Sequence, residues 1–150
     1  MFGNNYIVME NYKFEFIDPR NIDIIMPLLA QVNKKTSREI LLQRIHEMVK
    51  ENYKCLGIYD NEVLIGICGL WFLTRHYCGK TIEPDHVMIE PHYQSKGLGK
   101  LLFEWIFNYA KENGYEASEL NTYVNNTRSH KFYYNLGYQI KGFHFVKILD

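Results

Sequence analysis

The sequence has no excess of one charge and little cysteine. Seventeen Lys and Arg residues balance seventeen Asp and Glu residues in a chain of 150 residues. A balanced chain has no overall field to attract nucleic acid or an anionic membrane, so we expect neither partner, and any anion site must be local. The three cysteines show no Cys-x-x-Cys spacing, and Cys55 and Cys68 lie in apolar runs. This pattern favours core packing in a reducing cytoplasm over disulfide bonds.

Long hydrophobic runs, internal repeats, low-complexity tracts and linkers are also lacking. No apolar stretch is long enough to span a bilayer, and residues 1–10 have neither the basic start nor the apolar core of a signal peptide. Residues 1–150 are therefore expected to form a single domain without a membrane segment.

Strand-like and helix-like patterns follow one another with short breaks. Alternating or continuous apolar runs predict strands at 12–17, 54–59, 63–73, 81–89, 117–124, 138–141 and 143–148. Apolar residues at three- and four-residue steps predict helices at 18–29, 37–49, 98–110 and 127–136. Hairpins beside crossover helices favour an α/β (mixed α+β) fold, with a mixed sheet and helices on both faces.

A polar turn containing two glycines joins the strand at 81–89 to the helix at 98–110. The start of a helix has free backbone N–H groups and a partial positive charge, which suit a phosphate. Gly97 and Gly99 would let a phosphate approach the backbone, and Lys96 and Lys100 add positive charge. Two glycines can also serve only to close a tight turn. A nucleotide-triphosphate loop would need GxxxxGK, and Leu102 occupies the third glycine position of a dinucleotide fingerprint.

Two segments of the chain carry recognisable motifs. Gln94 to Gly99 (QSKGLG) fits the pattern (Q/R)xxGx(G/A) and follows a predicted strand. Asn126 to Tyr138 (NTRSHKFYYNLGY) resembles the signature NxxAxxFYxxxGF, with Ser129 for alanine and Tyr138 for phenylalanine. Both motifs resemble those of the GCN5-related N-acetyltransferase (GNAT) family. The predicted element order is similar to that of the family over nearly the whole chain, which implies the GNAT fold with a mostly antiparallel mixed sheet.

The resemblance implies acetyl-CoA as co-substrate. In similar proteins two neighbouring parallel strands splay apart, and the pantetheine arm pairs with the backbone of one of them. Carried over, Val87 and Ile89 would supply these main-chain contacts, and Asn126 and Tyr133 would contact the cofactor from the other side. The pyrophosphate would be held by the turn, which consists of Gln94, Ser95, Lys96, Gly97, Leu98, Gly99 and Lys100.

The implied chemistry is direct transfer of an acetyl group to an amine. An alkyl amine has a pKa of about 10.4, so a base or a water chain must remove its proton at neutral pH. Glu83 and Asp85 alternate along a predicted strand and are candidates for the base, although both can also be carboxylates on a solvated strand end. Pro84 between them indicates an irregular or edge position. By resemblance Tyr133 protonates the leaving thiolate, and packing is the alternative for this tyrosine.

No metal is expected, because the spacings of His76, His86, His92 and Cys78 match no zinc pattern. A small-molecule primary amine is the favoured acceptor. A protein lysine, or a non-catalytic CoA-binding module, are the alternatives. His144 and Lys147 are expected on the last strand, at the acceptor cleft or an oligomer contact; the alternative is that the lysine only protects an exposed strand edge. The aromatic C-terminal strands are compatible with a homodimer.

Overall fold

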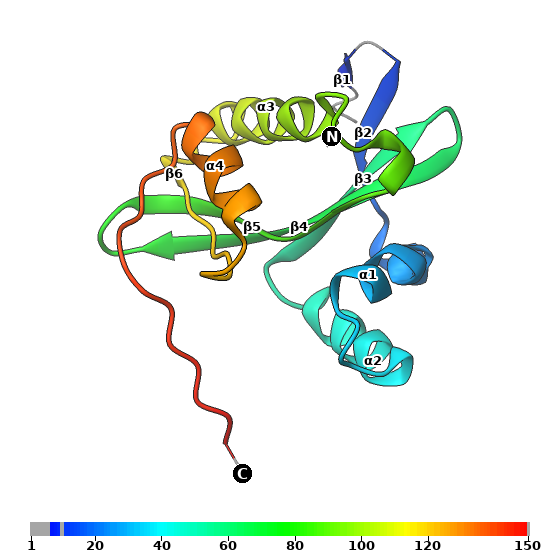
Figure 1. Ribbon diagram of the computed structural model, residues 1–150, viewed down its shortest axis with the longest axis horizontal. Helices are drawn as coiled ribbons and strands as arrows, with labels where there is room; N and C mark the ends of the chain where they lie inside the picture. Colours follow the sequence, from blue (N-terminus) through cyan, green and yellow to red (C-terminus); the bar gives the residue numbers. More distant parts are fainter. Residues whose placement is uncertain (1–6, 10, 150) are drawn as a thin grey trace.

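A computed structural model describes residues 7–9 and 11–149. Within them the chain forms one sheet of six strands in the order β1-β2-β3-β4-β5-β6, with helices on both faces (Figure 1). The strands are β1 Ile7–Met9, β2 Tyr12–Phe16, β3 Tyr53–Asp60, β4 Val63–Arg75, β5 Gly79–Ile89 and β6 Ala117–Ser118. The α-helices are α1 Met26–Val32, α2 Arg38–Met48, α3 Leu98–Glu112 and α4 Thr127–Asn135, and the 3-10 helices are η1 Pro19–Ile25 and η2 Pro91–Tyr93.

The sheet is mixed and mostly antiparallel. Each strand from β1 to β5 pairs antiparallel with the next, and β5 pairs parallel with β6. The α3 helix lies between β5 and β6 in the sequence and supplies the long crossover that a parallel pair requires. The predicted fold class is therefore confirmed.

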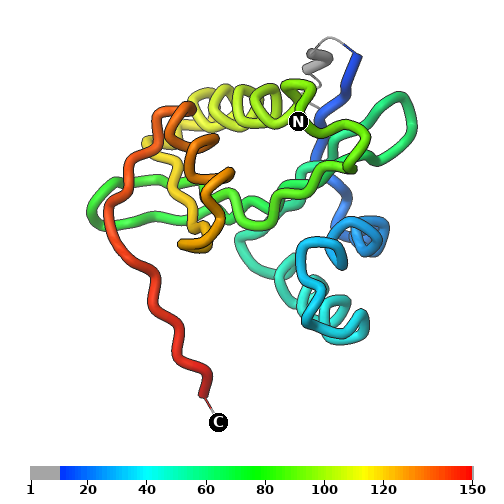
Figure 2. The backbone as a smooth tube through the Cα atoms, in the orientation of Figure 1, coloured from blue at the N-terminus to red at the C-terminus, as the bar shows by residue number. Residues whose placement is uncertain are grey.

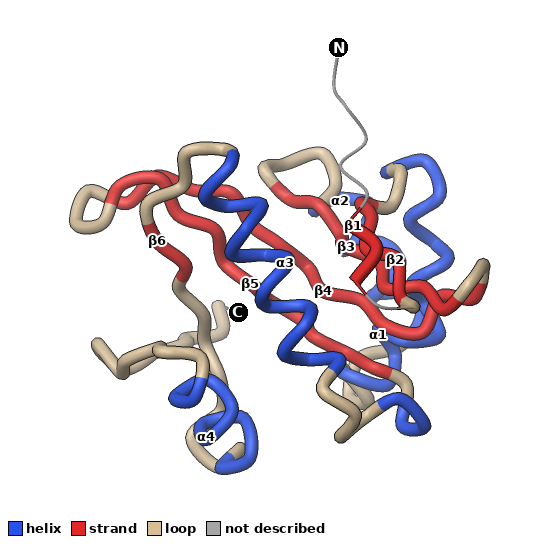
Figure 3. Tube along the Cα trace, turned by 90° about the horizontal axis from the view of Figure 1, so that it is seen from above, coloured by secondary structure: helices blue, strands red, loops and turns tan. Residues whose placement is uncertain are grey.

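Two apolar layers hold the sheet between its helices. The α3 face contains the larger core, in which Leu102, Phe103 and Trp105 pack against strand residues such as Leu56 and Leu70. The opposite face is covered by η1, α1 and α2, whose buried residues include Ile25 and Ile45. Seen from above, α3 runs across the sheet, with α1 and α2 behind it (Figure 3).

Local sequence signals account for the helix boundaries. Ser37 lies at the start of α2 and its hydroxyl accepts a hydrogen bond from the Ile40 N–H at 3.3 Å. The α3 helix ends at Asn113-Gly114, where Gly114 takes a left-handed conformation (φ +73°). The predicted helices at 37–49, 98–110 and 127–136 are confirmed within two residues at each end.

The C-terminal prediction was wrong. Residues 139–149 belong to no strand, and in Figures 1 and 2 this segment leaves the body of the protein on an extended path. The predicted strand at 117–124 is reduced to Ala117–Ser118. Apolar alternation shows that a segment can form a strand but does not supply the neighbouring edge that must pair with it. The short strand β1 was not predicted.

We predict that Phe103→Ala destabilises the protein strongly. Phe103 is fully buried on α3 and its ring contacts Phe132, Tyr133 and Tyr138, so it joins the helix α4 region to the core. Its removal should lower the free energy of unfolding by about 3–5 kcal/mol, measured by urea titration. Phe107→Ala, at a half-buried position on the same helix, is the control and should lose less. Equal losses would contradict this account.

Candidate functional site

The site begins where β5 and the segment that follows β6 separate. Backbone bonds join Glu116 N–H to the Lys80 carbonyl (2.8 Å) and Glu119 N–H to the Ile82 carbonyl (3.2 Å). Alternate residues of a strand present their backbone groups to the same edge, so Pro84 would be the next residue to face this partner. Proline has no N–H, and the ladder cannot continue through it. Beyond Pro84, β5 and the segment that follows β6 diverge, as seen from above in Figure 3.

A β-bulge follows Pro84. In the β4–β5 register Leu70 lies opposite Pro84 and Cys68 opposite Val87, so two residues of β5 face Gly69 alone. The extra residue reverses the alternation of backbone groups. Glu90 N–H donates to the Ile65 carbonyl at 2.8 Å, toward β4, which leaves Val87 and Ile89 with their backbone groups directed to the other edge. No strand of the described chain pairs with that edge from Glu83 to Ile89.

The glycine turn lies at the end of this free edge. Gly97 is the N-cap of α3 with φ +83°, and Ser95 also has a positive φ of 60°. The first backbone bond of the helix runs from Leu101 N–H to the Gly97 carbonyl at 3.2 Å. The N–H groups of Leu98, Gly99 and Lys100 precede it and have no acceptor within the helix. They form a cluster of donors at the positive end of a helix fifteen residues long.

Gly97 and Gly99 differ in what a side chain at each position would meet. A Cβ on Gly97 would meet no atom within 4 Å, so the residue borders open space. A Cβ on Gly99 would lie 3.3 Å from Cζ of Phe132, so Gly99 allows α3 and α4 to approach each other. Leu98 is buried and can offer a ligand only its backbone. The expectation that Gly99 leaves room for phosphate therefore needs correction: its missing side chain faces Phe132.

A basic residue that sequence reasoning missed also reaches the turn. Arg128, in the first turn of α4, donates from Nη2 to the Ser95 hydroxyl at 3.0 Å. Lys96 lies over the Tyr93 ring at 5.7 Å, and Lys100 pairs with Glu104 at 3.7 Å. Three cations thus surround the helix start. Arg128 lies inside the second motif, at a position the motif does not define, and only the approach of α4 to the turn identifies it.

Gln94 and Asn126 are occupied by contacts within the chain. The Gln94 amide donates to the Ile89 carbonyl at 2.8 Å, which ties the turn to the end of β5. The Asn126 side-chain carbonyl accepts from Ser129 N–H at 3.2 Å and caps α4. These bonds position the backbone around the site.

Tyr133 lies on α4 among aromatic side chains. Its ring contacts Phe103, Phe132 and Tyr138 at centroid distances of 5.4–5.8 Å. Burial raises the pKa of its phenol, and Cys68 adds to the rise. Tyr133 packs against the same core cluster as Val87 and Ile89 on the free edge of β5. Tyr134, its neighbour, is 62% exposed.

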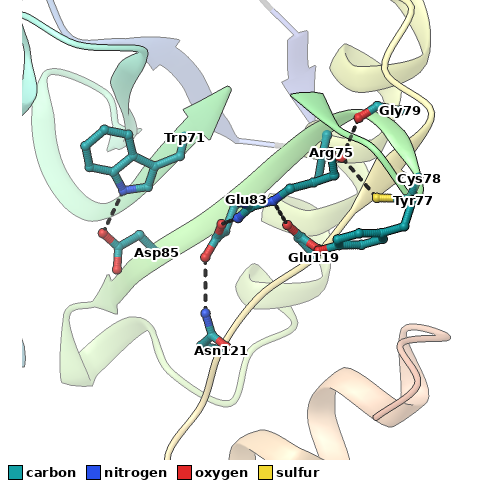
Figure 4. Close-up of polar contacts among 10 residues, drawn as sticks. Trp71, Arg75, Tyr77, Cys78, Gly79, Glu83, Asp85, Glu119 and Asn121 are labelled. Atoms are coloured by element: carbon teal, nitrogen blue, oxygen red, sulfur yellow. Dashed lines mark hydrogen bonds and ion pairs between the residues drawn. The ribbon is translucent and has the colours of Figure 1, made fainter. Parts of the chain in front are cut away.

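Glu83 belongs to a network of side chains that bridges the gap between β5 and the segment that follows β6 (Figure 4). Its carboxylate accepts from Arg75 Nη2 and Asn121 Nδ2, each at 3.2 Å. Arg75 also donates from Nε to Glu119 at 2.6 Å, and the Tyr77 hydroxyl donates to the same carboxylate at 2.8 Å. Burial raises the pKa of the Glu83 carboxyl, the Glu119 charge adds to this rise, and the Arg75 guanidinium opposes it. Contacts between side chains therefore connect β5 and the segment after β6 at the level where their backbone pairing has stopped.

Asp85 has one clear partner, the indole N–H of Trp71, at 3.1 Å (Figure 4). Trp71 is the cross-strand partner of Glu83, so both carboxylates lie beside the same tryptophan. A β-bulge begins at Asp85, so the regular alternation assumed for these two carboxylates ends there. Glu83 is the more enclosed of the two, with 18% of its side chain exposed.

His86 is enclosed behind this site. Its Nε2 lies 2.5 Å from the Tyr53 hydroxyl, and burial lowers the pKa of the imidazole. In the described chain, no three His, Cys, Asp or Glu side chains are grouped so that they could hold a metal ion. Over the same residues, none of the helices combines the length and apolarity needed to cross a bilayer.

The sequence matches the family described as "Acetyltransferase (GNAT) family" over residues 21–138. This range includes the free edge of β5, the glycine turn and α4. The chain belongs to the GNAT acetyltransferase family, which makes it an N-acetyltransferase by class.

Individual relatives are distant. The uncharacterized N-acetyltransferase YhdJ of Bacillus subtilis is 24% identical over 123 residues, which are 81% of this chain and 87% of that protein. The aminoalkylphosphonate N-acetyltransferase of Salmonella typhimurium is 28% identical over 74 residues, 49% of this chain and 48% of that protein. Among solved structures, AAC(6')-Iy in complex with the bisubstrate analogue CoA-S-monomethyl-acetylneamine has a TM-score of 0.76 at 14% identity, covering 92% of this chain and 99% of that one. This last likeness shows the fold alone.

Proposed function

We propose that the protein transfers the acetyl group of acetyl-CoA directly to a primary amine of a small molecule. One observation carries the proposal: the unpaired edge of β5 leads into the free N–H groups at the start of α3. An extended, hydrogen-bonding arm that ends in a pyrophosphate fits this arrangement, because the edge pairs with amides and the helix start binds phosphate. Lys96, Lys100 and Arg128 supply the matching positive charge.

Val87 would bind the pantetheine arm through its backbone N–H and carbonyl, and Ile89 through its N–H, since Gln94 occupies the Ile89 carbonyl. The segment from Gln94 to Lys100 would hold the pyrophosphate. Asn126 would contact the cofactor from the α4 side. Gln94 contributes by fixing the Ile89 carbonyl, and Leu98, Gly99 and Lys100 contribute their N–H groups. No metal takes part in this proposal.

Glu83 is the base we favour for the incoming ammonium group. A carboxyl whose pKa is raised is a better proton acceptor than an ordinary one, and Arg75 and Asn121 fix its orientation. The proton leaves nitrogen for the Glu83 carboxylate directly or through water, and the free amine then attacks the thioester carbonyl. Asp85 is the alternative base.

Tyr133 would protonate the departing sulfur. As the carbon–sulfur bond breaks, negative charge develops on the thiolate, and a phenol kept protonated by burial can donate to it. Tyr133 and Val87 pack against the same apolar core, which contains Cys68, and this supports the role.

A small acceptor is supported by the names of two similar proteins, which refer to an aminoalkylphosphonate and to an acetylneamine analogue. A cytoplasmic location is supported by three free cysteines, two of which are buried. The proposal includes association of two copies, supported by the exposed apolar side chains of residues 139–149.

Thiol release from acetyl-CoA over a panel of amines tests the proposed function. The panel should contain aminoglycosides, aminoalkylphosphonates, polyamines and a lysine peptide. Turnover with a small amine supports the proposal, whereas turnover with the peptide alone would assign a protein acceptor. Binding of acetyl-CoA by calorimetry without turnover on any amine would indicate a non-catalytic module.

Gly97→Val should raise the Kd for acetyl-CoA at least about tenfold, because losing one charge-assisted hydrogen bond to phosphate removes about 1.5–3 kcal/mol. Its side chain would extend into the open space at the helix start. Gly114→Val is a matched control, since Gly114 also has a positive φ and open surroundings but lies at the far end of α3. Calorimetry should show a weakened Kd in the first variant alone. Unchanged affinity in a folded Gly97→Val protein would contradict the phosphate site.

Tyr133→Phe should lower kcat by about 100-fold, the low end for a positioned acid, because a thiolate is already a fair leaving group. The ring and its packing are retained, so the Kd for acetyl-CoA should change little. Tyr134→Phe is the control, because its ring lies about 100° further around the helix and is largely exposed. Equal kcat in both variants and the wild type would leave Tyr133 with a packing role alone.

Glu83→Gln should lower kcat/KM most at neutral pH and least near pH 10. The Glu83 carboxyl can accept a proton only after it has ionised, so the wild-type base becomes active as the pH rises through the raised pKa of this carboxyl. Free amine increases about tenfold per pH unit below an amine pKa of about 10.4, so at high pH a base is no longer needed. The pH profile of Asp85→Asn is measured in parallel. If that variant alone shows the pH-dependent loss, Asp85 is the base; an equal loss at every pH for Glu83→Gln indicates substrate positioning.

A further inference from the structure

The two residues of the β5 bulge are tied to one pair of aromatic side chains. Asp85 accepts a hydrogen bond from the indole N–H of Trp71 on β4 at 3.1 Å (Figure 4). His86 Nε2 lies 2.5 Å from the hydroxyl of Tyr53 on β3. Tyr53 and Trp71 are cross-strand partners, and their ring centroids are 5.2 Å apart. Side chains therefore connect the bulge to both of the strands that lie beside it in the sheet.

Gly69 gives the His86 ring its path across β4. It is the residue of β4 that alone faces the two bulge residues. A Cβ on Gly69 would lie 2.5 Å from Nε2 of His86 and 2.9 Å from Cε2 of Tyr53, too close for either ring to stay in place. The missing side chain therefore allows an imidazole from β5 to cross β4 and reach a phenol on β3.

The Tyr53 hydroxyl is the hydrogen-bond partner on which the His86 ring depends. The other ring nitrogen, Nδ1, is buried and has no hydrogen-bond partner among the residues that the structure describes. A buried polar group that loses its partner costs more free energy than the hydrogen bond itself contributes. The bond to Tyr53 therefore favours the arrangement of β5 in which His86 reaches β3.

The apolar residues after the bulge do not fix the register of β5 by themselves. Val87 and Ile89 pack in the α3 core, and Met88 packs in the layer on the opposite face. A strand without the bulge would exchange these faces and still bury apolar side chains. It would also direct the backbone groups of Val87 and Ile89 to β4, and it would carry His86 to the face away from Tyr53. The polar contact therefore distinguishes the two registers.

From this geometry we propose that His86 and Tyr53 are positioning residues that hold β5 in its bulged register. They act through the backbone, by keeping the N–H groups of Val87 and Ile89 at the free edge. Their effect on affinity rests on the proposed function, in which this edge binds the pantetheine arm. The apparent Kd for acetyl-CoA then depends on the fraction of molecules in which the bulge is formed.

Amide hydrogen exchange followed by NMR tests the register without any ligand. In the wild type the Met88 N–H, which faces β4, should exchange slowly, and the N–H groups of Val87 and Ile89 should exchange rapidly. Tyr53→Phe keeps the ring and removes the hydroxyl, so Met88 should exchange about tenfold faster while the amides of β3 are unchanged. Tyr59→Phe, at the other end of β3, is the matched control and should behave as the wild type. An unchanged Met88 rate in Tyr53→Phe, or equal acceleration throughout β3 and β5, would overturn the proposal.

Two substitutions of His86 separate positioning from packing. Glutamine can place its terminal amide near the position of Nε2 and bond to the Tyr53 hydroxyl, whereas asparagine is too short to reach it. Calorimetry should show the Kd for acetyl-CoA raised about tenfold in His86→Asn and in Tyr53→Phe, and close to the wild-type value in His86→Gln. Equal affinities of the Asn and Gln variants would overturn the positioning role. A wild type that does not bind acetyl-CoA would contradict the proposed function, and the exchange rates would still support or overturn the proposed register.

Discussion

The end of backbone pairing between β5 and β6 at Pro84 is the constraint on which the site depends. A proline at the edge that faces β6 stops the ladder after the Ile82 carbonyl, and the bulge opposite Gly69 then turns Val87 and Ile89 toward the same edge. If the ladder continued to Ile89, the backbone groups proposed to bind pantetheine would be used within the sheet. The Arg75–Glu119 and Glu83–Asn121 contacts bridge the opening and hold the sheet and the segment after β6 at a fixed separation.

Much of this could be predicted from local sequence, because the signals are local. The glycine turn, the apolar face of α3 and the cap at Ser37 each depend on residues a few positions apart, and each was found where expected. Glu83 and Asp85 were candidates for the base because they alternate along a predicted strand, and this role stays a prediction. Pro84 indicated an irregular strand, and a bulge follows it. The contacts of Arg75, Asn121 and Arg128 could not be predicted, because each joins segments that are more than thirty residues apart in the sequence.

The C-terminal strands show the opposite limit. Their alternation is real, and the same apolar residues that predicted strands are the ones exposed in the structure. Strand propensity describes a segment that fits a pleated, half-buried surface, and whether that surface exists depends on the rest of the molecule. In the part of the chain that the structure describes, open edges remain at β6, which has two residues, and along β5 from Glu83 to Ile89, and residues 139–149 pair with neither. The two strands predicted at the C-terminus are therefore absent because the segment has no pairing edge in the structure, although its path is extended (Figure 1).

The charge distribution connects these features. The formal net charge is zero, yet cations gather at the start of α3 while Glu83, Asp85 and Glu119 gather at the other end of the free edge. From residue 83 to residue 89 a strand rises about 20 Å, more than the Debye length of about 8 Å at physiological ionic strength, so each cluster acts largely on its own surroundings. One end thus favours an anion and the other a cation. Under the proposed function, a phosphate-bearing acyl donor would be drawn to the α3 end of β5 and a protonated amine to the Glu83 end.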